Sequence, residues 1–342
     1  MVWPPGIRGC ATGNYHIPSD FSAYRRALRK DGRMPFIPRS YAYALLATLL
    51  WSTVATAFKL GLSYFDHDIA SLLTLSVFFS VVFLFTVSLL GRHGSTFFSP
   101  DRALLMSSLS GLLNPFLYYL VLFRAYDLLP ASEAQPLNYV WPITLSVFSA
   151  LIFKYRLHAR QVAAMSLGFL GVIVISTHGA FSLRPDNPLG VCLAAGSSLI
   201  WAGYWIINIG DSRPSLQKMR LNFTFGLLYL LLFVGLTGSR WTLPSLSGIL
   251  CAAWIGLCEM GLPFLLWMRA LNLARAGSIS HVVYLSPFLS LLWLNRVLKE
   301  TIRVSSIAGL CLIICGILIG SKGARSGELI KQPSTRKPTG SE

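Results

Sequence analysis

Ten apolar stretches of helical length follow one another along the chain, separated by short polar connections. An apolar helix of about 20 residues is long enough to cross the hydrocarbon core of a bilayer. We therefore predict an all-α integral membrane protein with ten transmembrane helices. The expected spans are residues 41–64, 69–90, 103–123, 131–153, 161–178, 189–209, 221–237, 246–268, 277–298 and 303–321.

The composition agrees with a lipid environment. Of the 342 residues, 54% are hydrophobic and 12% are charged, whereas a soluble domain carries about 25% charged residues. The net charge of +16 would suit a nucleic-acid partner, but half of this excess lies in residues 1–40 and 322–342 and most of the rest in short loops. Basic flanks around apolar spans are the topology signal of membrane proteins. We therefore expect a lipid bilayer as partner and no nucleic acid.

The second half of the chain repeats the first in a fixed register. Residues 125–176 align without a gap on residues 270–321, which lie 145 positions later, and ten of the 52 aligned pairs are identical. These pairs include Tyr139/Tyr284, Pro142/Pro287, Lys154/Lys299 and Gly171/Gly316. An odd number of spans in each repeat gives the two repeats opposite orientations. We expect two inverted five-helix repeats, over residues 40–178 and 189–321, between disordered tails at 1–39 and 322–342.

The basic residues also predict the orientation. With both termini in the cytoplasm, the segments on that side hold 22 Lys and Arg residues, the outer loops hold six, and Lys59 lies inside the first span. Cytoplasmic segments are enriched in Lys and Arg. We therefore expect cytoplasmic termini and a location in the inner membrane of a prokaryotic cell. Met34 lies directly before the first span, and we hypothesise that translation begins there, so that residues 1–33 are not made.

The sequence contains no metal or cofactor motif. Its six cysteines lie mostly inside apolar spans, where buried thiols are commoner than metal ligands or disulfides. No phosphate-binding loop of the Walker A type occurs, so we expect no direct use of ATP. We expect neither a metal nor a cofactor.

Three short motifs resemble a known family. They are Leu50–Thr53 (LWST), Asn138–Pro142 (NYVWP) and Ile200–Ala202 (IWA). They resemble the EamA-domain transporters of the drug/metabolite transporter superfamily, and the likeness covers residues 40–321. The NYVWP run is similar in particular to the aromatic amino acid exporters of that superfamily. The resemblance implies ten helices in two inverted repeats, a central cavity and alternating access.

The chain departs from this family at the ends of the fourth and ninth spans, where the family usually carries Gly-Glu. The second repeat reads Lys299-Glu300, which keeps the acid and not the glycine. The first repeat reads Lys154-Tyr155-Arg156 and lacks the acid. This departure leaves the expected fold unchanged. It argues against assigning to this chain any function that the acids at these turns have in the family.

Two carboxylates within the spans are candidate functional groups. Glu259 lies in the middle of the eighth span, and an ionisable side chain at that depth is costly unless it has a partner or a role. It would carry a proton, contact a cationic group of a substrate, or hydrogen-bond to a neighbouring helix. Glu133 lies near the outer end of the fourth span, where it would bind an ammonium group or a proton, or complement the dipole of its helix.

Aromatic and amide side chains placed deep in the spans would line a cavity suited to an amphipathic organic solute. Pro136, Pro142 and Pro287 remove backbone donors, and we expect them to bend their helices and shape this cavity. His281 is either a gating residue or a satisfied interior histidine. Together with the two carboxylates, the predicted cavity comprises Trp51, Asn114, Gln135, Asn138, Tyr139, Trp141, Trp201, Tyr204, His281 and Tyr284.

The fifth and tenth spans carry faces of small residues, which let helix backbones approach closely. The residues are Ala164, Gly168 and Gly171 in the fifth span and Gly309, Gly316 and Gly320 in the tenth. We interpret these faces either as scaffold or as the contact of a homodimer.

These features predict a secondary transporter that exports a small organic metabolite, amino-acid-like or drug-like, driven by a proton or solute gradient. A membrane-embedded enzyme acting on lipids or peptides is the alternative, and a non-transport scaffold is a third. Ser278, Ser280 and His281 lie close together, but no Gly-x-Ser-x-Gly elbow and no clear acid partner accompany them. We therefore favour transport over catalysis.

Overall fold

A computed structural model describes residues 39–91, 101–152, 154, 159–178, 187–211, 213–238, 244–273 and 282–323. Met34, Tyr155 and His281 lie outside these ranges, as do residues 1–38 and 324–342 of the expected tails. All regular secondary structure within the described ranges is helical.

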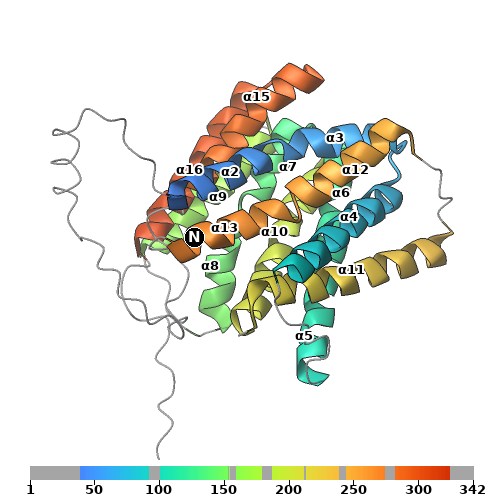
Figure 1. Ribbon diagram of the computed structural model, residues 1–342. Coiled ribbons are helices and arrows are strands. Elements are labelled where there is room, and N and C mark those ends of the chain that lie inside the picture. The colour runs from blue at the N-terminus through green and yellow to red at the C-terminus, as the bar shows by residue number, and fades with distance from the viewer. Residues whose placement is uncertain are drawn as a thin grey trace, which may run out of the picture.

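The helices follow the order of the predicted spans (Figure 1). The first half of the chain contains α2 (Arg39–Ser52), α3 (Val54–Tyr64), α4 (Ile69–Leu90), α5 (Asp101–Gly111), the π-helix η1 (Leu112–Leu117), α6 (Tyr118–Leu128), α7 (Ala131–Asn138), α8 (Trp141–Ile152) and α9 (Ala159–Ser176). The second half contains α10 (Pro188–Ile209), α11 (Ser215–Thr237), α12 (Leu246–Cys258), α13 (Leu262–Leu273), the 3₁₀ helix η2 (Val282–Leu285), α15 (Ser286–Leu298) and α16 (Val304–Gly323).

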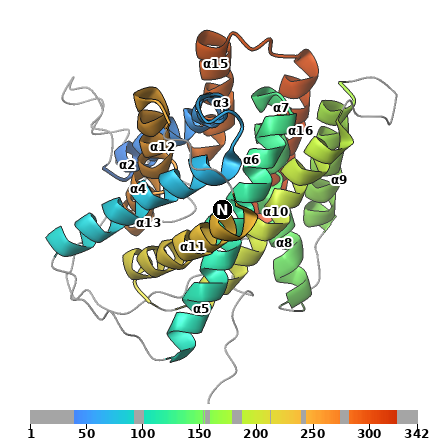
Figure 2. The same ribbon diagram turned by 90° about the vertical axis from the view of Figure 1, so that its right-hand side faces the viewer.

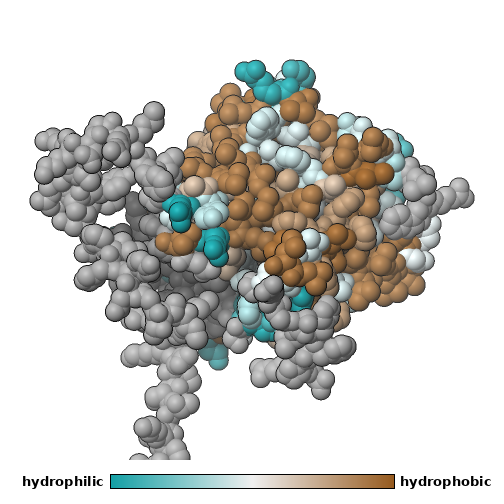
Figure 3. All heavy atoms as spheres, in the orientation of Figure 1, coloured by the Kyte–Doolittle hydropathy of each residue, from teal (hydrophilic) through white to brown (hydrophobic). Residues whose placement is uncertain are grey.

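The molecule is a multi-pass membrane protein. Seven helical segments in the described part of the chain are long and apolar enough to cross a bilayer: Arg39–Tyr64, Ile69–Leu90, Ala103–Leu128, Ala159–Ser176, Pro188–Asn208, Ser215–Thr237 and Leu246–Leu271. Val282–Leu298 and Val304–Ile319 are shorter apolar helices. The predicted fourth span consists of the two short helices α7 and α8. Apolar side chains cover much of the face shown in Figure 3, as expected where lipid is the solvent.

Several spans are interrupted near their centres. The first is divided at Thr53, the fourth at Tyr139 and Val140, and the eighth over residues 259–261. In the third span, Asn114 has extended dihedral angles (φ −145°, ψ 120°) directly before Pro115. Such breaks release backbone groups from the helical hydrogen-bond ladder, and they are tolerated at membrane depth only inside a protein or around a cavity.

The three prolines expected to bend helices occupy two kinds of position. Pro142 is the second residue of α8 and Pro287 the second residue of α15. The missing N–H of a proline costs nothing at the start of a helix, so both prolines begin helices instead of bending them. Pro136 lies within α7, which ends two residues later at Asn138.

The small-residue faces of α9 and α16 pack against each other along these two adjacent helices (Figures 1 and 2). A Cβ atom on Gly171 would lie 2.7 Å from the carbonyl oxygen of Gly309, and a Cβ atom on Gly309 would lie 2.7 Å from that of Gly171. Larger side chains would therefore force the helices apart. The faces serve packing within one chain, which favours the scaffold interpretation over the homodimer contact.

The remaining helices form the central bundle. α2 packs against α13, α6 against α10, and α4 against both α11 and α12. α5 packs against α11, where a Cβ atom on Gly111 would lie 2.4 Å from the carbonyl oxygen of Asn222. α12 approaches α4 as closely, because a Cβ atom on Gly256 would lie 2.2 Å from the carbonyl oxygen of Ser76.

Candidate functional site

Glu259 lies at the break between α12 and α13, in the interior of the bundle. The hydroxyl of Tyr119 on α6 donates a hydrogen bond to its Oε1 at 3.1 Å. The indole Nε1 of Trp51 on α2 donates to its carbonyl oxygen at 3.3 Å. The carboxylate is therefore held by a side chain of α6, and the backbone at the break is held by a side chain of α2.

Aromatic rings connect α2 to α10 beside this carboxylate. The ring of Phe264, one turn beyond Glu259, lies 5.3 Å from Trp51 and 6.2 Å from Trp201. Trp201 stacks on Tyr204 at 5.5 Å and lies 4.6 Å from Tyr118. These separations are typical of favourable aromatic pairs. The fold thus brings together Trp51, Trp201 and Tyr204 of the predicted cavity.

Asn138 and Trp141 flank the break between α7 and α8. The Tyr118 hydroxyl donates to Oδ1 of Asn138 at 3.2 Å, and Nδ2 of Asn138 donates to the Ser197 hydroxyl at 2.7 Å. Both ends of this amide therefore hold α7 to α6 and α10. The Trp141 ring lies 6.4 Å from Trp201 and extends the aromatic cluster.

Asn114 occupies the break in the third span and is 2% exposed. Its side chain neighbours that of Tyr204, as does that of Asn222, whereas Nδ2 of Asn208 donates to the backbone carbonyl of Tyr204 at 2.8 Å. Sequence reasoning did not select Asn222, although an amide within the apolar run of α11 was a visible signal. It also missed Tyr119, whose hydroxyl group gives no pattern in the sequence that distinguishes it from the aromatic residues around it.

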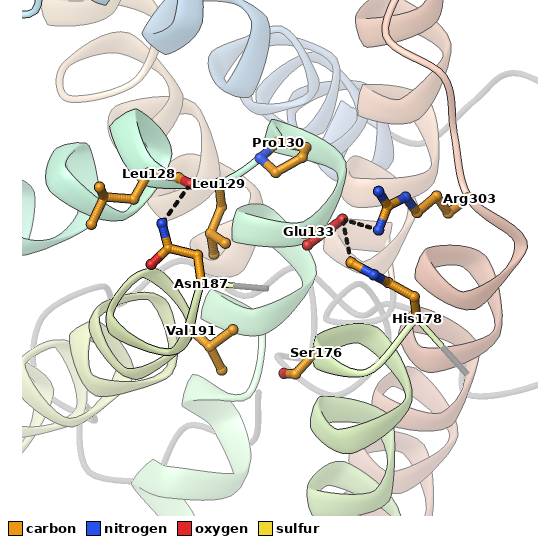
Figure 4. A pocket seen from close by; sticks show the side chains of 9 residues that line it. All are labelled: Leu128, Leu129, Pro130, Glu133, Ser176, His178, Asn187, Val191 and Arg303. Carbon is orange, nitrogen blue, oxygen red and sulfur yellow. Dashed lines mark hydrogen bonds and ion pairs between the residues drawn. The ribbon is translucent and has the colours of Figure 1, made fainter. Parts of the chain in front are cut away.

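Glu133 lies apart from this cluster, in the first turn of α7. Its buried Oε1 lies 3.1 Å from Nε2 of His178 and 3.6 Å from Nη1 of Arg303 (Figure 4). These groups border a cavity of about 90 Å³ whose other walls are Leu128, Leu129, Pro130, Ser176, Asn187 and Val191. Glu133 therefore belongs to an ion-paired group that joins α7 to the beginning of α16.

The other predicted cavity residues occupy the surroundings of α7 and α15. Gln135 is buried in α7, and Tyr284 is buried in η2. Tyr139 lies near Tyr284 and beside Ser286. His281 lies outside the described residues.

The central arrangement suits binding of a solute. One carboxylate accepts a cationic group, and the aromatic rings offer apolar faces and cation–π contacts. Within the described ranges, no group of three His, Cys, Asp or Glu side chains is placed to hold a metal ion.

Comparison with known proteins identifies the family. The model of the EamA-like transporter family matches residues 38–177 and again residues 188–321, which together make up most of the chain. The chain belongs to the EamA-like transporter family. It is therefore a membrane transporter, as the motifs predicted, and not the enzyme considered as the alternative.

Individual relatives agree with this assignment. An uncharacterized transporter, YvbV, of Bacillus subtilis is 28% identical over 61% of this chain and 69% of its own length. The aromatic amino acid exporter YddG of Ancylobacter novellus is 25% identical over 59% of this chain and 69% of its own. The cysteine/O-acetylserine efflux protein of Shigella boydii is 28% identical over 37% of this chain and 67% of its own. A crystal structure that is 22% identical covers 83% of this chain and 99% of its own, with a TM-score of 0.60, and shows the same fold.

Proposed function

We propose that this EamA-family transporter exports an amphipathic amine or zwitterion of the aromatic amino acid class. The observation that carries the proposal is the position of Glu259, an acid at a helix break beside an aromatic cluster that includes Trp51 and Trp201. An ammonium group would pair with the carboxylate, and an apolar ring would pack on the indoles. Relatives named as exporters of aromatic amino acids and of cysteine or O-acetylserine support both the solute class and the direction.

We propose that ten spans form two inverted repeats. The seven long helical segments, the two shorter apolar ones and the α7–α8 pair together correspond to ten spans. Contacts also occur in matching pairs: α2 with α13 corresponds to α10 with α6, and α12 with α4 corresponds to α5 with α11. In Figure 2 the C-terminal end of α15 lies at the top and that of α8 at the bottom, as opposite orientations of the repeats require.

The 145-residue register extends to the breaks themselves. Gly111 and Gly256, each in close contact with a neighbouring helix, are separated by this number of positions. Asn114 and Glu259, which occupy the breaks of the third and eighth spans, are separated by the same number. The two repeats thus contribute an amide and a carboxylate at equivalent positions, and only the carboxylate can carry a proton. We propose that Glu259 couples export to the proton gradient across a prokaryotic inner membrane, with both termini in the cytoplasm.

Alternating access requires a part that closes the outer half of the path, and α7 fits this role. All eight of its residues are buried, and it packs against α3, α6, α9, α10, α15 and α16. Opening to the outside would displace α7 from the second repeat, where Glu300 and Arg303 contact it.

Tryptophan uptake into proteoliposomes with and without an imposed pH gradient tests the proposal. We expect gradient-stimulated uptake by the unaltered protein, loss of the stimulation in Glu259→Gln, and normal uptake by Asp66→Asn, whose acid is exposed between α3 and α4. Stimulated uptake by Glu259→Gln would overturn the coupling role of Glu259. No uptake of any aromatic amino acid or amine would overturn the solute class.

A further inference from the structure

A second polar group is buried in the bundle, around Tyr204. The side chains of Asn114 and Asn222 both neighbour that of Tyr204 and are 2% and 1% exposed. The Oδ1 atoms of both amides have no hydrogen-bond partner among the described residues. Buried carbonyl oxygens almost always have a partner, since leaving one unsatisfied costs about 1–3 kcal/mol. Two such oxygens on neighbouring amides indicate that something else binds there.

The backbone around this group also departs from the α-helix. Pro115 has no N–H group, so the carbonyl of Gly111 lacks its α-helical donor and is left with the wider pairing of the π-helix η1. That carbonyl faces α11, because a Cβ atom on Gly226 would lie 3.3 Å from the Gly111 oxygen and 2.4 Å from Cδ of Pro115. Carbonyl and amide oxygens at broken helices are the groups with which transporters coordinate cations.

The basic side chains near this group have other partners. Arg213 pairs with Asp211, and Nζ of Lys218 donates to the carbonyl oxygens of Asn208 and Asp211. Arg220 precedes Asn222 by two residues on α11 and therefore points to another side of the helix. Its guanidinium group donates a hydrogen bond to Ser88 and lies over the ring of Phe85, both on α4. Arg213, Lys218 and Arg220 thus bond to groups other than the two amide oxygens.

We propose that Asn114, Asn222 and Tyr204 form a buried site for a monovalent cation, either an inorganic ion or the ammonium group of a solute. The ligands are neutral oxygens, which suit a singly charged ion better than a divalent one, because protein sites for divalent ions usually include a carboxylate. The site is separate from Glu259 and lies at the equivalent break of the other repeat. It therefore does not depend on the proton-coupling role of Glu259.

Thermal unfolding of the purified full-length protein in detergent tests the site. The melting temperature is compared in equal concentrations of sodium chloride, methylammonium chloride and choline chloride, since choline is too bulky for a site enclosed by these side chains. A ligand that binds the folded state raises the melting temperature. We expect the melting temperature in the salt of the ligand to exceed that in choline chloride by about 2–4 °C. A rise in sodium alone identifies an inorganic ion, whereas a rise in methylammonium alone identifies a solute ammonium group.

The variants assign the effect to these residues. Asn222→Leu removes one oxygen and is expected to abolish the difference in melting temperature between the salts. Asn222→Asp keeps the shape of the side chain and adds a negative charge, so it is expected to enlarge the difference, whereas Asn295→Asp at the exposed surface of α15 leaves it unchanged.

Equal melting temperatures in all three salts would overturn the proposal, because the oxygens would then bind water. If Asn222→Leu does not fold, a response of Asn222→Asp no larger than that of Asn295→Asp would overturn it as well. Neither result affects tryptophan uptake in liposomes, which tests the proposed function by itself.

Discussion

Lys154 and Lys299, 145 positions apart, both adopt the left-handed backbone conformation, with φ of 53° and 55°. Lys154 follows α8, and Lys299 is the residue directly after α15. Glycine is the residue that enters this conformation without strain and commonly terminates helices in it. The backbone is thus the one that suits the glycine expected here from the family resemblance, and it implies that both lysines are strained.

Replacing Lys299 by glycine is expected to stabilise the protein. The left-handed conformation costs a residue with a side chain about 1 kcal/mol relative to glycine, so Lys299→Gly should raise the melting temperature in detergent by about 2–4 °C. Arg296→Gly, within the last turn of α15, is the matched control and should lower it. A lower melting temperature for Lys299→Gly would show that the lysine side chain stabilises the turn by contacts that outweigh the strain.

A larger side chain at the contact between α9 and α16 is expected to destabilise the fold. A Cβ atom on Gly171 would lie 2.7 Å from the carbonyl oxygen of Gly309 and from Cγ1 of Ile313. Overpacking of this kind costs about 1–3 kcal/mol, so Gly171→Val should lower the melting temperature and the yield of monodisperse protein. Ala163→Val, at an exposed position of α9, should change neither. Equal yields and melting temperatures of the two variants would contradict this packing.

Hydropathy predicted most helices to within a few residues, because a lipid-facing helix must be apolar over a fixed length. Ile69–Leu90 agrees with the prediction, whereas α11 begins at Ser215 instead of residue 221. The polar residues at the start of α11, including Lys218 and Arg220, concealed its first turns. The breaks at Asn114 and Glu259 were not predicted as such, because a break depends on partners from other helices and not on local apolarity.

Glu300 is expected to stabilise the beginning of α7. Its carboxylate accepts hydrogen bonds from the backbone N–H groups of Ala131 at 3.3 Å and Ser132 at 2.9 Å. Hydrogen bonds to a charged group contribute about 1.5–3 kcal/mol, so Glu300→Ala should lower the melting temperature by several degrees. Glu300→Gln retains an acceptor oxygen and should lose less. Unchanged stability of Glu300→Ala would mean that water replaces the carboxylate without loss.

Trp201 is expected to contribute to the affinity for an aromatic solute. It contacts Tyr118, Tyr204 and Phe264 at the centre of the aromatic cluster. Loss of one aromatic contact of about 0.5–1.5 kcal/mol corresponds to a rise of about 3- to 10-fold in KM, so Trp201→Leu should raise KM for tryptophan uptake more than it lowers the maximal rate. Phe169→Leu, on the exposed face of α9, is the control. A lower rate at constant KM would assign Trp201 to the conformational change instead.

The Asp211–Arg213 pair is expected to make stability sensitive to acid. Burial alone would raise the pKa of Asp211, but hydrogen bonds and charge from Arg213 outweigh it and hold the pKa below its usual value near 3.8. The ionised form is therefore favoured in the folded protein. Its stabilising effect is present above the pKa of the unfolded chain and is lost as the pH falls below about 4 through the lower, folded value. Asp211→Asn should be less stable at neutral pH and lose less stability on acidification. Asp66→Asn should behave like the unaltered protein in both respects.

The candidate site was predicted only in part, for a physical reason. Trp51, Trp201 and Glu259 were selected because large aromatic rings and an acid are conspicuous in apolar spans, and the fold brings them together. Glu133 was conspicuous for the same reason, yet it lies with His178 and Arg303, because the beginnings of α7 and α16 meet the end of α9 there. Composition identifies which side chains are costly in lipid, but it does not say which partner each one finds.

The bond between Glu300 and the backbone of Ser132 spans 168 positions of the chain. A ribosome therefore releases the start of α7 long before it makes the carboxylate that accepts from this N–H group. During synthesis the N–H groups at the start of α7 are therefore hydrated, or bound by other proteins, until Glu300 has been made. A chain shortened before residue 300 would leave these N–H groups without their acceptor, so correct assembly of the first half depends on the arrival of the second.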